Sequence, residues 1–187
     1  MSKTESFVKN FWKEKKMVGA MSPSSRFLAK KMLENIPFSK VKTLVELGPG
    51  TGVFTREIVK HMAPDAKLLV FELNDNFMKR LQKEFTDPRV ILIHDSAEKI
   101  GEYLSKYDLT STDAVISSLP LANFPTALKS KILKESFDRL NENGTYIQFQ
   151  YSLNAKNLIK SQFPKVKIAF TPLNFPPAFV YTCRKTK

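Results

Sequence analysis

Short apolar runs alternate with helix-like segments along most of the chain. The runs at 43–47, 67–72, 90–94 and 113–117 have the length and composition of buried strands. Each is followed by a helix-like stretch, at 51–62, 74–85, 96–104 and 126–140. Such alternation of strand and helix predicts a mainly parallel sheet with helices on both faces.

The pattern changes after Gly144. A strand pattern at 145–151 and a helical one at 154–162 precede two further strand patterns, at 166–171 and 178–184. Only the proline-rich segment 172–177 separates these last two strands, and so short a connection joins antiparallel strands more easily than parallel ones. We therefore expect an α/β fold with a mainly parallel seven-stranded sheet that ends in an antiparallel hairpin. This arrangement resembles the Rossmann-like fold of the class I methyltransferases.

Length and composition indicate one domain. The chain has 187 residues, of which 42% are hydrophobic, enough for one full core. We expect a single methyltransferase domain over 1–187, with a helical extension at 1–40 that covers the active site and a Rossmann-like core at 41–187. No segment has the roughly 18 to 20 uncharged apolar residues of a membrane span, and residues 1–16 lack the core of a secretory signal, so we expect a cytoplasmic protein. We expect no metal site, because the lone Cys183 has no partner cysteine.

The charge is large and unevenly distributed. The formal net charge is +12, of which residues 1–42 contribute +7 and residues 151–187 another +7, leaving the middle at about −2. Two basic ends predict contact with a polyanion, either nucleic acid or an anionic membrane surface. We expect the near-neutral central part of the chain to bind a cofactor.

The first predicted strand leads into a glycine loop. Glu46 closes the strand, and Gly48, Gly50 and Gly52 follow. Glycine permits positive φ and lets a ligand approach the backbone closely. A dinucleotide fingerprint would need a glycine three residues after Gly50, where Val53 stands, so the loop matches GxGxG preceded by an acid. An acid near the loop suits the amino-acid tail and sulfonium of S-adenosylmethionine, which has no pyrophosphate.

Polar residues also end the next two predicted strands. Glu72 ends the second strand, where a carboxylate can accept hydrogen bonds from both ribose hydroxyls. Asp95 and Ser96 end the third strand, within reach of the adenine. Asp95 and Glu98 equally fit a capping box, so a purely structural role for Asp95 stays open.

Substrate is expected next to the loop after the fourth strand, because reactants in open α/β sheets meet at the carboxyl ends of the strands. This loop supplies Ser117 and Ser118, whose hydroxyls and carbonyls can serve the cofactor and the reacting amine. Phe124 adds a ring face for a cationic or apolar group. A proline-stiffened loop without function is the alternative.

Several segments together resemble one methyltransferase family. The chain is similar to the bacterial phosphatidylethanolamine N-methyltransferases of the small soluble type, from about Val18 to Arg184. The segments that carry the resemblance are VGAMSPSSR (18–26), VELGPGTGVFTR (45–56), SSLPLANFP (117–125), QFQY (148–151) and NFPPA (174–178), which includes Asn174. The resemblance implies stepwise methylation of the phosphatidylethanolamine amine towards phosphatidylcholine, by a cytoplasmic enzyme that visits the inner face of the membrane.

The alternative family is the ribosomal RNA adenine dimethylases. These RNA methyltransferases have a glycine loop similar to that of this chain. They carry an Asn-x-Pro-aromatic motif whose ring stacks on a flipped base. This chain has Ser118-Leu119-Pro120-Leu121 instead, without the amide and the ring, and after Arg184 too few residues remain for their usual RNA-binding domain. Nucleic acid is a partner only under this alternative.

An amphipathic helix is expected at 4–17. On a helical wheel one face carries Phe7, Phe11 and Trp12, and the neighbouring face carries Lys9, Lys13 and Lys16. Aromatic residues enter the headgroup boundary while lysines meet anionic lipid, so this helix can lie on a membrane. Docking of the aromatic face on the protein's own core remains the alternative.

The expected reaction is in-line attack of a neutral amine on the sulfonium methyl group. Charge is dispersed in this step, so alignment and exclusion of water matter more than a strong general base. We expect Tyr151 to hold the amine, with Ser118 beside it. Tyr151 also fits a packing residue at the end of a strand.

Overall fold

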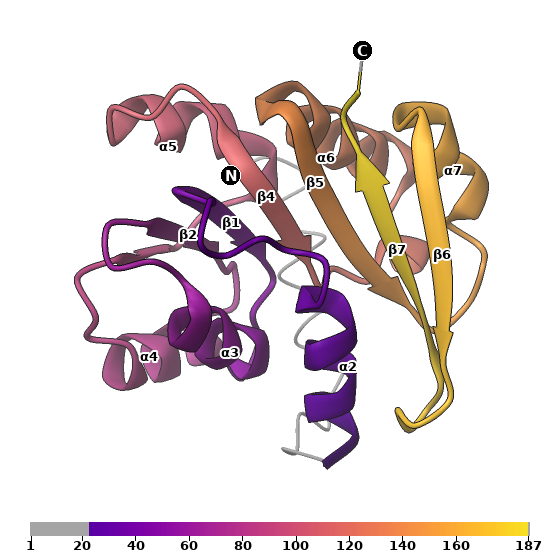
Figure 1. Ribbon diagram of the computed structural model, residues 1–187, viewed down its shortest axis with the longest axis horizontal. Helices are drawn as coiled ribbons and strands as arrows, with labels where there is room; N and C mark the ends of the chain where they lie inside the picture. The colour runs from indigo at the N-terminus through magenta and orange to yellow at the C-terminus, as the bar shows by residue number, and fades with distance from the viewer. Residues whose placement is uncertain (1–22, 187) are drawn as a thin grey trace.

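The computed structural model describes residues 23–186, in which seven strands form one sheet (Figure 1). The strand order is β3-β2-β1-β4-β5-β7-β6. β7 runs antiparallel to both of its neighbours, and the other neighbouring pairs are parallel. The strands are β1 Thr43–Leu47, β2 Lys67–Phe71, β3 Val90–Ile93, β4 Thr112–Ser117, β5 Leu140–Gln150, β6 Lys165–Thr171 and β7 Ala178–Arg184. The predicted Rossmann-like fold and its terminal antiparallel hairpin are confirmed.

Helices cover both faces of the sheet (Figure 1). One core cluster joins the sheet to α2 and α3, through residues such as Met32 and Ile58. The other joins it to α5, α6 and α7, through residues such as Leu104, Ile132 and Ile159. The helical elements are α2 Pro23–Leu33, α3 Val53–His61, α4 Asp75–Glu84, η1 Ala97–Lys99, α5 Ile100–Lys106, η2 Leu121–Asn123, α6 Thr126–Arg139 and α7 Lys156–Gln162.

Two boundaries differ from the sequence prediction. β5 begins at Leu140, although residues 140–144 have the composition of a turn. Backbone pairing with the end of β7 outweighs this local preference: Asn143 N–H donates to Lys185 O at 2.7 Å, and Lys185 N–H donates to Gly144 O at 3.0 Å. The helix predicted at 96–104 is a short 3-10 turn, η1, followed by α5.

The carboxyl ends of the parallel strands converge at one edge. The ladder continues past the strand ends, because Gly48 N–H donates to Phe71 O and Ser118 N–H donates to Leu47 O, each at 2.9 Å. The loops after β1, β2 and β4 are thereby held together. This is the edge at which open α/β sheets bind their ligands.

Only part of the predicted N-terminal extension falls within the described residues. α2 packs against α3, β5 and β7. The predicted membrane helix at 4–17, with its aromatic and lysine faces, lies outside the described residues. Within residues 23–186, no helix has the length and apolarity to cross a bilayer.

Candidate active site

The loop after β1 turns on three glycines with positive φ: 70° at Gly48, 55° at Gly50 and 77° at Gly52. Packing also excludes a side chain at two of them. A Cβ on Gly48 would lie 2.7 Å from Leu119 Cδ2, and one on Gly52 would lie 2.8 Å from Phe85 Cε2. A Cβ on Gly50 would meet no atom within 4 Å. Gly50 is therefore the glycine whose missing side chain leaves space for a ligand against the backbone.

Glu46 is fully buried in β1. Its Oε2 accepts a hydrogen bond from Thr55 Oγ1 on α3 at 2.7 Å, while Oε1 has no partner among the described residues. Burial raises the pKa of this carboxyl to about 8, although the bond from Thr55 acts in the opposite direction. A buried carboxylate oxygen without a donor is costly, so a ligand that brings a donor or a positive charge would be favoured here.

Glu72 follows β2 and is tied to the glycine loop. Its Oε2 accepts from Gly50 N–H at 3.2 Å, and its Oε1 accepts from Asn74 N–H at 2.8 Å. Asn74 in turn caps α4, accepting from the N–H groups of Asn76 and Phe77. Burial raises the pKa of Glu72, and the backbone donors counteract this. The carboxylate is thus fixed in one orientation at the edge of the site.

A narrow pocket lies beside Glu72. Most of its wall is apolar, and polar groups are supplied by Glu72, Asp95 and Ser96. An apolar lining with a few polar groups at its margin is the chemistry by which proteins bind aromatic rings. The pocket is lined by Gly48, Phe71, Glu72, Leu73, Asp95, Ser96, Ala97, Leu119, Phe124, Leu128 and Ile132.

Asp95 and Ser96 also have structural partners. Asp95 Oδ2 accepts from Lys99 Nζ at 3.0 Å and from the Tyr103 hydroxyl at 2.9 Å. These donors and Ser96 N–H outweigh burial and lower the pKa of Asp95. The N-cap of η1 is Ser96, whose Oγ accepts from Glu98 N–H, so the predicted capping box with Asp95 as the cap is not formed.

Two glutamines of β5 hold the loop after β4. The Nε2 atoms of Gln148 and Gln150 both donate to Leu119 O, at 3.0 and 2.9 Å. Gln150 Oε1 also accepts from Ala122 N–H at 3.3 Å. Sequence reasoning gave these glutamines no role, although polar residues two apart in an apolar strand share one face and thus carry a signal. They make the loop a fixed wall of the site.

The two serines of this loop differ in their surroundings. Ser117 is buried, and its Oγ accepts from Leu119 N–H at 3.4 Å, so its hydroxyl serves the loop itself. The Oγ of Ser118 is buried without a hydrogen-bond partner among the described residues. Ser118 is therefore the serine whose hydroxyl is left for another group.

Three other predicted residues lie around the same edge. Phe124 is buried and lines the pocket beside Glu72, so its ring does not face solvent. Tyr151 follows β5 and is 56% exposed, with its ring edge-on to Phe149 at a centroid distance of 5.5 Å. Partial burial raises the pKa of the Tyr151 hydroxyl, and the side chain of Asn174 lowers it. Tyr151 and Asn174 thus lie together beyond the carboxyl end of β5.

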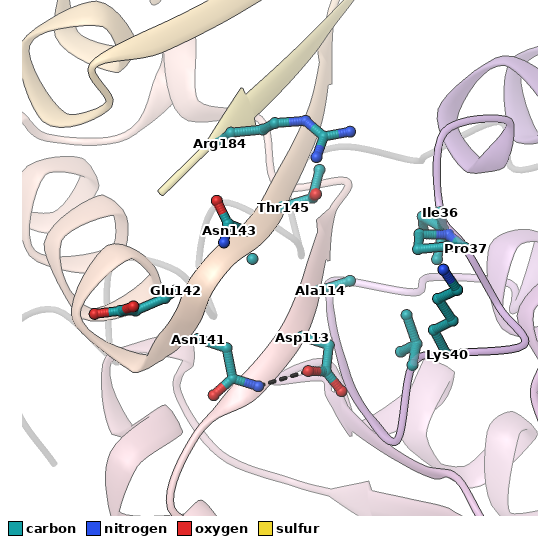
Figure 2. A pocket seen from close by; sticks show the side chains of 12 residues that line it. Ile36, Pro37, Lys40, Asp113, Ala114, Asn141, Glu142, Asn143, Thr145 and Arg184 are labelled. Atoms are coloured by element: carbon teal, nitrogen blue, oxygen red, sulfur yellow. Dashed lines mark hydrogen bonds between the residues drawn. The ribbon is translucent and has the colours of Figure 1, made fainter. Parts of the chain in front are cut away.

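A wider pocket lies at the opposite edge of the sheet. It is lined by residues that precede β1 and by residues at the starts of β4 and β5. Figure 2 shows Asn141 and Asp113 in this pocket, joined by a hydrogen bond, with Lys40 and Arg184 at its sides. None of the predicted site residues lines it. The converging loops at the carboxyl edge therefore remain the candidate active site.

Comparison with known proteins identifies the family of the chain. The family model of the ribosomal RNA adenine dimethylases matches residues 13–169. The ornithine lipid N-methyltransferase of Singulisphaera acidiphila is 28% identical over 183 residues, covering 97% of this chain and 95% of that enzyme. Ribosomal RNA small subunit methyltransferase A of Mycoplasma capricolum subsp. capricolum is 28% identical over 110 residues, covering 58% of this chain and 40% of that enzyme.

A solved structure has the same fold. The 1,6-didemethyltoxoflavin-N1-methyltransferase of Burkholderia thailandensis, solved with S-adenosylhomocysteine, superposes with a TM-score of 0.73 at 12% identity, covering 98% of this chain and 87% of that one. The family match extends over most of the chain and includes the glycine loop, the strands β1 to β5 and the first part of β6. The chain belongs to the ribosomal RNA adenine dimethylase family and is an S-adenosylmethionine-dependent N-methyltransferase.

Proposed function

We propose that this enzyme methylates the amine of a membrane lipid, converting phosphatidylethanolamine towards phosphatidylcholine. The observation that carries the proposal is the extent of the lipid-enzyme match. Likeness to an ornithine lipid N-methyltransferase runs along 97% of the chain, whereas likeness to the Mycoplasma ribosomal RNA enzyme covers 58%. Both phosphatidylethanolamine and ornithine lipid offer a primary amine at a bilayer surface, so one site chemistry suits either.

Cofactor binding is assigned to the carboxyl edge of β1, β2 and β3. Glu72, already oriented by two backbone donors, would accept from the ribose hydroxyls. Gly50 would admit the cofactor against its backbone, with Gly48 and Gly52 shaping the turn. Glu46, protonated in the cofactor-free fold, would release its proton to solvent on binding and accept from the ammonium group of the cofactor's amino-acid tail. Asp95, Ser96 and the buried Ser117 would complete the wall around it.

When bound, S-adenosylmethionine supplies the electrophilic methyl group, and the chain's own residues position the nucleophile. The unpartnered Ser118 Oγ and the carbonyl groups of its loop offer acceptors for amine N–H groups. The Tyr151 hydroxyl has a raised pKa, so it stays protonated at neutral pH and can accept from the amine through a lone pair. Asn174 would hold Tyr151 in this position. Alignment of a neutral amine is the main catalytic contribution we assign.

The loop after β4 favours a lipid amine over a base. Leu121, at the place where the ribosomal RNA adenine dimethylases carry an aromatic ring, is fully buried in the core. Its side chain therefore offers no surface on which a flipped base could stack. We assign the net charge of +12 to an anionic membrane surface, where residues 4–17 would form a peripheral helix on the inner face.

Methyl transfer from labelled cofactor tests this proposal. The purified protein should label phosphatidylethanolamine in vesicles that also contain an anionic lipid, and it should leave ribosomal RNA unlabelled. Vesicles with ornithine lipid in place of phosphatidylethanolamine compare the two amines directly. The variant Gly50→Val serves as the control for cofactor-dependent labelling. Label in the RNA alone would show that the lipid assignment is wrong.

A further inference from the structure

The turn between β6 and β7 exposes large apolar side chains. Phe175 is 88% exposed, Leu173 68% and Phe170 55%. No charged residue occurs anywhere in the segment 168–183 that contains them. Scattered apolar residues are normal on protein surfaces, but two on one uncharged turn, with Phe170 near the end of β6 before it, form a patch that calls for a partner.

This exposure belongs to an ordered turn. Asn174, between the two most exposed residues, is buried, and its Nδ2 donates to Pro176 O at 2.6 Å. At the base of the turn, the rings of Phe170 and Phe179 lie 5.2 Å apart between centroids. The side chains of Leu173 and Phe175 are thus presented outward by a turn whose polar residue faces inward.

The turn lies at the catalytic edge of the sheet. β6 runs in the same direction as β1 and β4, so the turn that follows β6 is at the edge of the glycine loop (Figure 1). Other exposed apolar residues share this side. Tyr151 and Leu153 follow β5, and Phe27 projects from α2, which contacts β5 and β7.

Basic residues accompany the apolar ones. Arg26 and Lys30, one turn apart on α2, are exposed on either side of Phe27. In the segment 151–187, which has no acidic residue, Lys156 begins α7 after the carboxyl end of β5, whereas Lys165 and Arg184 lie at the far end of the hairpin. An uncharged apolar tip with cations on the neighbouring helices matches a bilayer with anionic headgroups, because the tip can enter the acyl boundary while the cations stay at the phosphates. An RNA ligand would instead require cations on the tip itself.

We propose that the β6–β7 turn is a membrane anchor that inserts Leu173 and Phe175 into the headgroup–acyl boundary. The anchor would press the carboxyl edge of the sheet against the bilayer, so that a lipid amine reaches the methyl donor without leaving the membrane. This inference rests on the proposed lipid substrate. It is independent of residues 4–17, because it uses a different part of the chain.

Vesicle sedimentation with a paired variant tests the anchor. Leu173→Ser with Phe175→Ser removes the apolar tip at two exposed positions, so the fold should be retained. We expect binding to phosphatidylethanolamine/phosphatidylglycerol vesicles to weaken by about tenfold or more, since each side chain would contribute roughly tenfold at full burial and both are buried only in part at the headgroup boundary. Gln82→Ser, an uncharged substitution at an exposed position on α4, is the matched control and should bind like the parent. Parent-like binding of the double variant would overturn the proposal.

Fluorescence reports the position of the tip directly. Trp12 is the chain's only tryptophan, so Phe175→Trp in a Trp12→Phe background places one probe on the turn. Its emission should shift to the blue on the same vesicles and be quenched by brominated acyl chains, whereas Gln82→Trp in that background should not respond. An unshifted probe on vesicle-bound protein would contradict insertion. Lipid-free self-association that depends on Phe175 would also contradict it, because the patch would then cover a second copy.

Activity separates this inference from the proposed function. The double serine variant should lose activity on vesicles but keep parental activity on short-chain phosphatidylethanolamine below its micelle concentration, with unchanged cofactor affinity. Equal activity of parent and variant on vesicles would overturn the anchor and leave the lipid substrate standing. Absence of any lipid methylation by the parent would instead refute the proposed function, whatever the fluorescence shows.

Discussion

The backbone N–H of Gly50 donates to Oε2 of Glu72 across 3.2 Å, joining the glycine loop to the end of the neighbouring strand. The two residues are 22 positions apart, and the carboxylate is otherwise held by Asn74 N–H. A ligand at this edge therefore meets an acceptor that is already oriented. This preorganisation reduces the entropy cost of binding.

Substitution of Glu72 should weaken cofactor binding. Glu72→Gln keeps the side-chain shape but removes the charge and one acceptor, and we expect a loss of about tenfold to a hundredfold in S-adenosylmethionine affinity by calorimetry. Glu102→Gln, at an exposed position on α5, is the charge-matched control and should bind like the parent. Unchanged affinity in a folded Glu72→Gln protein would show that Glu72 does not bind the cofactor.

Two glycine substitutions should separate binding from stability. Gly50→Ala adds a methyl group in open space at φ 55°, so we expect a stability loss of only about 1 kcal/mol and a clear loss of cofactor affinity. Gly52→Ala brings a Cβ to 2.8 Å from the Phe85 ring, so its main effect should be on unfolding. Denaturant titration and calorimetry on both variants give the comparison. A Gly50→Ala protein with parental affinity would show that the cofactor does not use this space.

The sequence predicted the sheet because its signals were local and repeated. Buried strands and helix-like segments alternate, and the segment 172–177 is too short for a parallel crossover. The strand conformation of residues 140–144 could not be predicted from the local sequence, because it depends on backbone hydrogen bonds with Lys185, which is far away in the sequence. For the site, glycine spacing and strand ends located Gly50 and Glu72. The roles of Gln148 and Gln150 depend on where the loop after β4 lies, which no local pattern encodes.

The pH dependence of stability should reveal Glu46. Its pKa is raised from 4.5 to about 8 by burial, so the folded protein holds a proton that the unfolded chain has released. The free energy of unfolding of cofactor-free protein should therefore fall as pH rises through this interval. Glu46→Gln abolishes this titration, so in denaturant unfolding its free energy of unfolding should exceed that of the parent by roughly 1 to 3 kcal/mol at pH 8 but not at pH 4.5. Parallel stability curves for parent and variant would show that Glu46 is ionised in the fold.

Because Gln148 and Gln150 donate to the same acceptor, we expect the effects of their substitutions on stability to be coupled. Leu119 O also accepts from Leu121 N–H at 2.9 Å, so it keeps one donor without the glutamines. Either glutamine alone still ties the loop to β5, whereas Gln148→Leu with Gln150→Leu removes both ties. The double variant should therefore lose more stability than the two single variants together, by on the order of 1 kcal/mol in a double-mutant cycle. Strict additivity would show that the two side chains hold the loop independently.

The most direct measurement of the central claim is the lipid profile of a host whose own membranes contain no methylated amine lipids. Expression of the parent chain should produce mono-, di- or trimethylated phosphatidylethanolamine, detected by mass spectrometry of the lipid extract. Gly50→Val at equal expression should produce none. Unaltered lipids, together with newly dimethylated adenines in the host's ribosomal RNA, would contradict the account and assign the enzyme to RNA.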